Sequence, residues 1–307
     1  MKKRVLITGA SGFIGTALAS HLRLSKRYEV VGMDIKVSDT SGFVKVDLLD
    51  QKAMIAFLRK KRPQIIFHLA GGRIADPKLM FSANVNTTIA LFETIPQVAR
   101  YRPRVIVMGS AAEYGDCFES KLITEKMMGR VDSQYGLVKL LQTQTALYFA
   151  RAGQDVMVAR LFNILGAGLP RSTAVGRFAS DIVRTEHGSG PMKLETGNLG
   201  AIRDYLDVRD ICSALRALSE HGRSGEIYNV CSQKGVVIRD LLRQMLALSP
   251  KNPLSFLEDT RCDAGVLRSV GSCVKLKKDT GWSPSYTFKQ GLQSTLEYYR
   301  HLGQSSL

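Results

Sequence analysis

Long apolar segments are missing from this sequence. No run of residues approaches the roughly 20 apolar positions that a transmembrane helix needs. Residues 1–4 are mostly basic and lead into a short run of strand type, not into the longer apolar region of a signal peptide. We therefore expect no membrane span and no signal sequence, and we expect the protein to act in the cytoplasm.

Cysteine clusters are missing as well. The five cysteines are odd in number, and none has the spacing of metal ligands. They are Cys117, Cys212, Cys231, Cys262 and Cys273. This usage is typical of reduced thiols in a reducing compartment, and we expect no metal site.

The chain also lacks blocks of like charge, internal repeats and low-complexity tracts, although its net charge is +16. A charge of this size can mark binding to nucleic acid or to anionic membranes. Because the basic residues are spread along the chain, we favour a basic surface focused near a pocket for a small polyanion. We expect no nucleic acid and no membrane among the partners.

What the sequence does contain is an alternation of apolar runs and helical patterns in its first half. This alternation predicts an α/β fold with a parallel sheet covered on both faces. The expected strands are 5–7, 29–33, 43–46, 65–70, 105–108, 156–163 and 228–231. The expected helices include 51–61, 84–99, 135–152, 238–248 and 288–301. His68, inside one of these strands, is expected to be a hydrogen-bonded core histidine.

A glycine-rich turn follows the first strand and opens a helix. The backbone N–H groups of such a turn, with the positive end of the helix dipole, bind phosphate. Gly9 permits the turn, Gly12 lets a pyrophosphate approach the backbone, and Gly15 lets the helix lie close to the sheet. The sequence therefore predicts a dinucleotide site, which the intervening residues complete: Ser11, Phe13 and Ile14.

An acidic residue ends the second strand. Asp34 follows the last glycine of the turn by roughly 20 residues, where a dinucleotide site has a carboxylate that accepts both ribose hydroxyls. A carboxylate there favours NAD, because a 2′-phosphate would face its charge. Lys36 could nevertheless help to hold that phosphate. We expect NAD(H) as the cofactor, with NADP(H) as the second possibility.

Three further residues indicate proton-transfer chemistry. Ser110 ends a central parallel strand, beside the crevice where such sheets bind ligands. Tyr135 and Lys139 share one face of the following helix, and an ammonium near a phenol lowers the phenol pKa from about 10 towards the working pH. Such a tyrosine can exchange a proton with a carbonyl or alcohol oxygen. We predict that Ser110 hydrogen-bonds the same oxygen.

Several short motifs, taken in order, match one family. They are Thr8–Gly15, His68–Ala70, Asn84–Thr87, Ser110 with Tyr114 and Gly115, Tyr135 with Lys139, Arg160 with Asn163 and Gly166, Arg203–Tyr205, and Gly281–Pro284. From about residue 4 to residue 302 the sequence resembles an extended short-chain dehydrogenase/reductase of the NAD-dependent epimerase/dehydratase branch, which modifies nucleotide sugars. Within that branch it is most similar to the GDP-4-keto-6-deoxymannose reductases.

The resemblance implies a Rossmann-type doubly wound parallel sheet in residues 1–163, to which segments near 203–231 return. It implies a smaller α/β domain in residues 164–307 that closes over a nucleoside-diphosphate sugar. In such reductases NAD(P)H gives a hydride to C4 of the keto sugar. Carried over to this chain, Tyr135 donates the proton, Lys139 lowers its pKa and holds the nicotinamide ribose, and Ser110 fixes the carbonyl.

The same resemblance implies further contacts. Besides the glycine turn, Tyr135 and Lys139, the residues implied to bind the cofactor are Asp34, Ile35, Asp47, Leu48, Leu69, Ala70, Gly71, Asn84 and Phe162. Those implied to bind the substrate are Arg73, Ser110, Asn163, Arg177, Arg203 and Arg261. Arginine suits a diphosphate because its planar guanidinium can make paired hydrogen bonds.

Two alanines separate the possible reactions. The 4,6-dehydratases of this branch carry an Asp-Glu pair directly after the strand-end Ser or Thr, and the 3,5-epimerase/reductases have a cysteine at the second of these positions. Here the positions are Ala111 and Ala112, which cannot transfer a proton. Glu113 comes one residue later, and on an extended chain its side chain would point to the other side.

A 4-ketoreductase is therefore favoured, and a nucleotide-sugar 4-epimerase with tightly bound NAD is the alternative. A non-catalytic or RNA-binding member of the superfamily is disfavoured, because such members often lose the tyrosine or the lysine and both are present here. The resemblance also implies a homodimer formed by helices 84–99 and 135–152. Its apolar surface would come from Leu137, Leu140, Leu141 and Leu147, unless these leucines simply pack on their own sheet.

Overall fold

The main sheet of the protein has seven parallel strands in the order β10-β6-β5-β4-β1-β2-β3. A computed structural model describes residues 2–37, 42–115, 121–128, 130–187, 195–196, 198–250, 257–258 and 266–304. The strands of the sheet are β1 Lys3–Thr8, β2 Tyr28–Asp34, β3 Val44–Lys45, β4 Ile65–His68, β5 Arg104–Ser110, β6 Val156–Leu161 and β10 Ile227–Val230. The predicted α/β class with a parallel sheet is confirmed.

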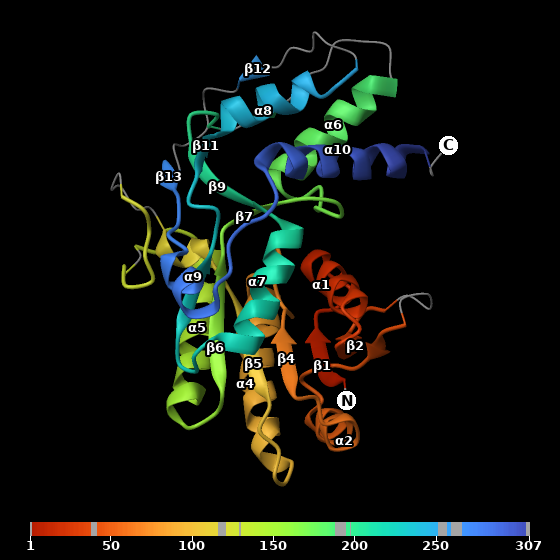
Figure 1. Cartoon of the computed structure of the whole chain (residues 1–307), viewed down its shortest axis with the longest axis vertical. Helices are drawn as coiled ribbons and strands as arrows, with labels where there is room; N and C mark the ends of the chain where they lie inside the picture. The colour runs from red at the N-terminus through yellow and green to blue at the C-terminus, as the bar shows by residue number, and fades with distance from the viewer. Residues whose placement is uncertain are drawn as a thin grey trace.

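Residues of the central strands alternate between two apolar cores. In β1, Val5 and Ile7 belong to one core and Leu6 to the other, and β4 repeats the pattern with Phe67 and Ile66. Both sides of each strand are thus buried, which explains why the strands are continuous apolar runs. The first core is covered by α1 Phe13–Leu24 and α7 Val208–His221, and the second by α2 Gln51–Lys61, α4 Thr87–Thr94 and α5 Gln134–Arg151 (Figure 1).

A smaller part of the molecule has its own sheet and core. Strand β9 Ile202–Asp207 pairs with β7 Asn163–Leu165, β11 Gly235–Val237 and β13 Arg268–Ser269, and β8 Glu195–Thr196 pairs with β12 Leu257–Glu258. Its core contains Phe178, Leu242 and Leu296. The helices here are α6 Ala174–His187, α8 Ile238–Ala247, α9 Val274–Thr280 and α10 Phe288–Gln304.

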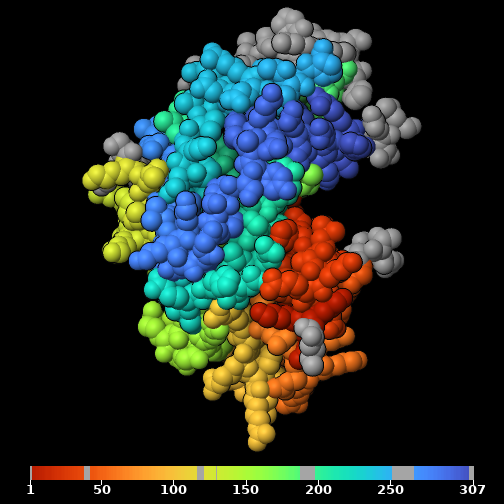
Figure 2. Space-filling view, viewed as in Figure 1, coloured from red at the N-terminus to blue at the C-terminus, as the bar shows by residue number. Residues whose placement is uncertain are grey.

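The carboxyl ends of the parallel strands face this smaller part (Figure 1). The glycine turn after β1 and Ser110 at the end of β5 therefore lie on the same edge of the sheet. The surface is hollowed between α1 and α10 on this side (Figure 2). Ligands of open α/β sheets bind along this edge, so the fold supports the predicted location of the site.

The helix expected at 84–99 starts earlier and is divided. It consists of α3 Pro77–Phe81, a π-helical turn η1 Ser82–Asn86, α4 and a 3-10 turn η2 Ile95–Gln97. The earlier start has a local cause, because the Asp76 side chain accepts a hydrogen bond from the Leu79 N–H and Pro77 occupies the first helical position. The strand expected at 156–163 is also divided, since Phe162 separates β6 from β7.

The prediction for His68 is confirmed. Its two ring nitrogens lie 2.9 Å from Thr8 Oγ1 and 3.0 Å from Thr88 Oγ1. Burial, followed by the charge of Lys139, lowers the pKa of His68 to about 3. His68 is therefore neutral and links β4 to β1 and α4.

Two expectations from composition concern the described residues. None of the helices in these ranges combines the length and apolar character needed to cross a bilayer. Three cysteines in the same ranges have free, buried thiols, namely Cys212, Cys231 and Cys273. Cys117 and Cys262 lie outside the described residues.

Candidate active site

The glycine turn has the geometry that the sequence predicts for phosphate binding. Gly9 has a φ of +67°, and a Cβ atom there would lie 2.7 Å from the backbone of Leu69 and Ala70. Gly12 is the N-cap of α1, and no side chain among the described residues caps this helix. The first N–H groups of α1 therefore stay available to an anion, which fits the pyrophosphate of a dinucleotide.

Asp34 ties the turn to the end of β2. Its carboxylate accepts hydrogen bonds from the Ser11 N–H at 3.0 Å and the Lys36 N–H at 3.2 Å. The Ser11 hydroxyl donates to the Lys36 carbonyl at 2.7 Å. A cavity of about 410 Å³ lies beside these residues and is lined by Ser11, Thr16, Ala19, Ser20, Arg23, Lys36 and Phe43. Two basic side chains thus face a space next to the Asp34 carboxylate.

The other residues predicted to contact the cofactor follow neighbouring strands. Leu69 and Ala70 are half-buried after β4, and Gly71 has a φ of +105°. Beyond β3, Asp47 is exposed and Leu48 is buried. Ile35 is 55% exposed at the end of β2. These residues therefore line the carboxyl edge on both sides of the glycine turn.

Asn84 and Phe162 differ from this pattern. The Asn84 side chain is fully buried and donates to the carbonyls of Gly72 and Met80, while its Oδ1 accepts from the Gly72 N–H. Both amide protons are thus used to hold the loop after β4. The Phe162 ring is also buried, and a Cβ atom at Gly271 would lie 2.5 Å from its Cζ. Both side chains therefore lie beneath the surface of the site and pack against the segments that form it.

Ser110 is fixed by the turn that follows it. It is the N-cap of a 3-10 turn, η3 Ala111–Tyr114, and its Oγ accepts a hydrogen bond from the Ala112 N–H at 3.2 Å. The hydroxyl proton of Ser110 is therefore free to be donated. The Ser110 side chain lies close enough to the Tyr135 phenol to lower its pKa, so two of the three predicted catalytic residues lie together.

Helix α5 carries Tyr135 and Lys139 against this turn. The Ser133 side chain caps the helix by accepting from the Gly136 N–H at 3.1 Å. A Cβ atom at Gly136 would lie 2.4 Å from the Ala112 carbonyl oxygen, so glycine allows α5 to pack directly on η3. This contact brings Tyr135 to Ser110.

The environment of Tyr135 acts on its pKa in both directions. Burial raises the pKa of Tyr135, whereas the nearby Ser110 side chain and the charge of Arg73 lower it. The Arg73 guanidinium carbon lies 5.2 Å from the centre of the Tyr135 ring. Of the arginines predicted to bind substrate, Arg73 is therefore the one that the described structure brings to Tyr135.

Lys139 is buried beneath the site. Its ammonium donates to the Met108 carbonyl and to Gln142 Oε1, and Gln142 in turn donates to Thr88. Burial lowers the pKa of Lys139 to about 8, and the charge of Glu113 acts in the opposite direction. A lysine poised in this range can exchange its proton near neutral pH.

The assumption that the chain is extended at Glu113 is wrong. Residues 111–114 form a 3-10 turn, not extended chain, and this turn brings the carboxylate back under Ser110. Glu113 Oε1 accepts from the Ser110 N–H at 2.7 Å, and Oε2 accepts from Arg160 Nε at 2.7 Å. The sequence carried a signal for this arrangement, because a serine followed three residues later by a glutamate is the pattern of a capping box.

The remaining predicted substrate residues lie in the smaller part of the molecule. Asn163 Nδ2 donates to the Asp204 carbonyl at 3.0 Å, and Arg203 donates to the carbonyls of Ile202 and Val266. Arg177 is exposed on α6. Arg261 lies outside the described residues. Asn163 and Arg203 thus stand on the paired strands β7 and β9, whereas Arg177 stands apart on a helix.

Asp204 is a residue whose importance the sequence did not reveal. Its carboxylate accepts from the N–H and hydroxyl of Ser232, from the Gln233 N–H and from the Gly271 N–H. Burial raises the pKa of Asp204, and these hydrogen bonds lower it. Asp204 therefore joins the segments that follow β10 and β13 to β9.

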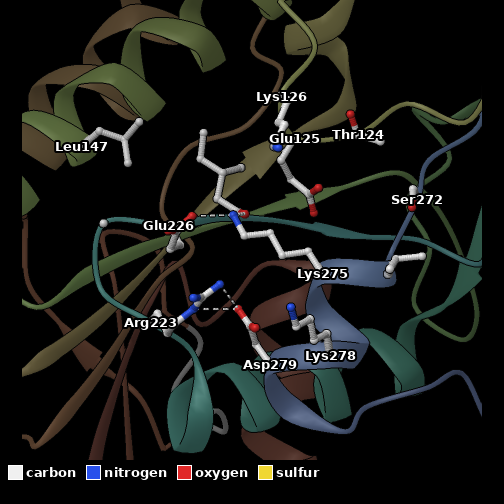
Figure 3. A pocket seen from close by; sticks show the side chains of 13 residues that line it. Thr124, Glu125, Lys126, Leu147, Arg223, Glu226, Ser272, Lys275, Lys278 and Asp279 are labelled. Atoms are coloured by element: carbon white, nitrogen blue, oxygen red, sulfur yellow. Dashed lines mark hydrogen bonds and ion pairs between the residues drawn. The ribbon is translucent and has the colours of Figure 1, made fainter.

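A second, larger cavity lies at the outer edge of β10 and is separate from these residues. It has a volume of about 730 Å³, and none of the predicted site residues lines it. Much of its charge is paired, with Lys275 Nζ 2.6 Å from Glu226 and Arg223 2.7 Å from Asp279 (Figure 3). This cavity is therefore not part of the candidate active site.

The sequence profile of one protein family covers most of this chain. The profile is described as the NAD dependent epimerase/dehydratase family, and it matches residues 5–231. The chain belongs to this family. The NAD dependence named in the family description fits the glycine turn and the carboxylate at the end of β2.

Individual relatives match this chain over nearly its whole length. A GDP-6-deoxy-D-mannose reductase from Pseudomonas aeruginosa is 30% identical over 305 residues, which cover 96% of this chain and 97% of the relative. The solved structure of RMD from Pseudomonas aeruginosa complexed with NADPH is 28% identical, has a TM-score of 0.87, and is matched over 98% of this chain and 99% of its own. The NAD complex of a UDP-glucose 4-epimerase from Thermus thermophilus is 26% identical, with a TM-score of 0.83 over 97% of this chain and 99% of its own.

Proposed function

We propose that the protein is an NAD(P)H-dependent reductase of a nucleoside-diphosphate 4-keto-6-deoxyhexose. The observation that carries the proposal is the assembly of Ser110, Tyr135 and Lys139 next to Ala111 and Ala112. The site has the groups for hydride and proton exchange at one carbon, without the acid and base that dehydration needs. The full-length similarity to a GDP-6-deoxy-D-mannose reductase supports a GDP-linked sugar.

In the proposed reaction Tyr135 donates its phenolic proton to the C4 oxygen of the keto sugar. Ser110 donates a hydrogen bond to the same oxygen, because its own oxygen already accepts from the Ala112 N–H. The Lys139 ammonium stabilises the phenolate that remains and holds the nicotinamide ribose. The bound nicotinamide supplies the hydride for the reduction. Asn163, Arg177, Arg203 and Arg261 are proposed to hold the nucleoside diphosphate, and Arg73 the sugar.

The test uses purified protein with GDP-4-keto-6-deoxymannose and NADH or NADPH. The proposal expects one reduced cofactor to be oxidised for each sugar consumed, as measured by absorbance, and native mass spectrometry to find little resident cofactor. An epimerase would instead arrive with NAD bound and consume no reduced cofactor. The similarity to the Thermus thermophilus epimerase keeps that second outcome as the alternative, and it is weaker than the similarity to RMD.

The two basic side chains beside Asp34 lead to a prediction about cofactor choice. Lys36 and Arg23 line the cavity next to the ribose carboxylate, so the protein should use NADPH as well as NADH. Lys36→Ala is expected to raise KM for NADPH by about 10- to 100-fold, since a charge-assisted contact is worth about 1.5–3 kcal/mol, and to leave KM for NADH nearly unchanged. The measurement is a pair of steady-state titrations, with Lys60→Ala as the control. Equal effects on both cofactors would contradict this role of Lys36.

The protein is further proposed to be a homodimer. Leu137, Leu141 and Tyr148 on one face of α5 are 48%, 39% and 61% exposed, whereas Leu140 and Leu147 are half-buried. A second copy that packs α4 and α5 against the same helices would cover this apolar face.

Sedimentation velocity at low micromolar concentration is expected to find a dimer. Leu141→Asp should convert it to a monomer, because a charge would be buried in an apolar interface. Val274→Asp on α9, at a position 62% exposed, is the matched control and should remain dimeric. A monomeric wild-type protein would reject this proposal.

The proposed function also suggests a role for each part of the chain, and the cysteines suggest a cellular location. Residues 1–163, with later segments near 203–231, are proposed to bind the cofactor, and most of residues 164–307 the sugar nucleotide. The protein is proposed to act in the cytoplasm, because the cysteines among the described residues are free thiols, as is typical of a reducing compartment.

A further inference from the structure

A buried ion pair lies directly behind the catalytic serine. Glu113 and Arg160 are only 1% and 4% exposed, and their side chains meet at 2.7 Å. Strand β5 makes room for them with Gly109, which pairs in register with Arg160. A Cβ atom at Gly109 would lie 2.8 Å from Glu113 Oε1 and 3.0 Å from Arg160 Cγ. The pair is therefore built into the end of the strand that presents Ser110.

Stability alone does not explain such a pair. Removing two charges from water is unfavourable, and apolar residues of similar volume usually fill a core at least as well. Glu113 instead contacts a residue of the candidate active site. One carboxylate oxygen accepts from the Ser110 N–H and the other from Arg160, whose guanidinium carbon lies 4.6 Å from the centre of the Tyr114 ring. Glu113 is thus held on both sides, with Ser110 as one of its partners.

We propose that Glu113 is a positioning residue of the proposed reductase, which fixes Ser110 through its backbone N–H and places a negative charge beneath the site. This inference rests on the proposed function. Arg160 serves it by holding the Glu113 carboxylate in place, and its charge opposes the rise in the pKa of Glu113 that burial causes.

The other charges around Tyr135 and Lys139 do not take over the effect of the Glu113 carboxylate. Tyr135 is faced by Arg73 from the loop after β4 and by Glu113 from η3. Lys139 is faced by Glu113 and by His68 on β4, and the low pKa of His68, about 3, leaves that imidazole neutral. Glu113 is thus the carboxylate, within the described residues, that acts on both groups.

The sign of the effect follows from these contacts. The Glu113 charge raises the pKa of Tyr135 and the pKa of Lys139, although burial is the larger influence on each. Neutralising Glu113 lowers both pKa values. Reduction needs the protonated tyrosine and the ammonium, so activity would then be lost at a lower pH as the solution is made more basic.

The test is Glu113→Gln, which keeps the shape of the side chain and removes its charge. Between about pH 6 and about pH 10, the basic limb of the kcat profile is expected to move down by about one pH unit, while KM for the sugar changes less than about twofold. The matched control is Glu125→Gln, because Glu125 likewise accepts a backbone N–H, from Asn229 at 2.9 Å, but lines the outer cavity (Figure 3). Its profile should coincide with that of the wild type.

A second measurement does not need the sugar. NADH affinity, followed by fluorescence across the same pH range, is expected to weaken as Lys139 loses its proton, and this transition should move down by a similar amount in Glu113→Gln. If the wild type binds NADH but reduces no keto sugar, the proposed function fails while this measurement still tests Glu113. A uniform loss of kcat with both transitions unmoved would overturn the inference, as would an unchanged variant.

Glu113→Asp keeps the test available if the glutamine variant does not fold. The shorter side chain retains the charge but draws it away from Ser110. We expect a lower kcat at every pH with the basic limb at its wild-type position. A displaced limb in Glu113→Asp would overturn the assignment of the effect to charge.

Discussion

Replacing Tyr135 with phenylalanine is expected to lower kcat for keto-sugar reduction by about 10³-fold. The phenol is the proton donor in the proposed reaction, and a positioned acid or base contributes roughly 10²–10⁴-fold. The ring itself should stay in place, because α5 is capped by Ser133 and packs on η3 through Gly136. The measurement is steady-state cofactor oxidation with saturating sugar and NADPH.

The control for this variant is Tyr148→Phe, on the same helix but 61% exposed. It should retain wild-type kcat. Tyr135→Phe should still bind NADPH within a few-fold of wild-type affinity, since the glycine turn and Asp34 are unchanged. A loss of less than about tenfold in kcat would contradict the assignment of Tyr135 as the proton donor.

The second large effect is expected on stability. Arg160→Met leaves the Glu113 carboxylate buried without its partner, and breaking a buried ion pair from one side lowers the free energy of unfolding by about 3–5 kcal/mol. Loss of the contact between Arg160 and the Tyr114 ring adds to this. The measurement is urea denaturation at neutral pH, followed by circular dichroism.

The loss of unfolding free energy in Arg160→Met should become smaller at low pH. Burial raises the pKa of Glu113, and removing Arg160 takes away a charge that opposes this shift. A group whose pKa is raised on folding favours the folded state when protonated, so the deficit should shrink as the pH falls through the folded-state pKa of Glu113. The double variant Arg160→Met/Glu113→Leu should recover most of the loss. A double variant no more stable than Arg160→Met would contradict the ion-pair account.

The parts of the site that the sequence predicted are those set by local geometry. The glycine turn, the end of β2 at Asp34 and the four-residue spacing of Tyr135 and Lys139 depend on short segments with fixed periods. The parallel sheet followed from continuous apolar strands that both cores bury. Each of these features could be predicted because neighbouring residues determine it.

The parts that were missed depend on contacts between distant segments. Glu113 reached Ser110 because residues 111–114 coil into a 3-10 turn and because Arg160, on the neighbouring strand, offers a partner. Asp204 gathers hydrogen bonds from residues 28 and more positions further along the chain. The hydrogen bonds of the Asn84 amide to Gly72 and Met80 were not predicted either, while its contact with the cofactor stays a prediction. Sequence spacing alone contains no information about such partners.

The proposed reaction rests on which groups flank Ser110. Because η3 carries two alanines, Tyr135 is the proposed proton donor at the substrate carbonyl, and Glu113 is held behind Ser110 by Arg160. We propose that a site of this composition reduces or oxidises one carbon and does not eliminate water. The side chains of η3 therefore indicate the type of reaction as much as the tyrosine and the lysine do.

The most direct test of the proposed reaction is to follow deuterium into the product from reduced cofactor that carries deuterium at both C4 positions of its nicotinamide. The protein is incubated with the labelled cofactor and GDP-4-keto-6-deoxymannose, and the sugar is analysed by nuclear magnetic resonance. The account predicts one deuterium at C4 of the sugar for each cofactor oxidised. A product with no deuterium, or with deuterium at another carbon, would contradict it.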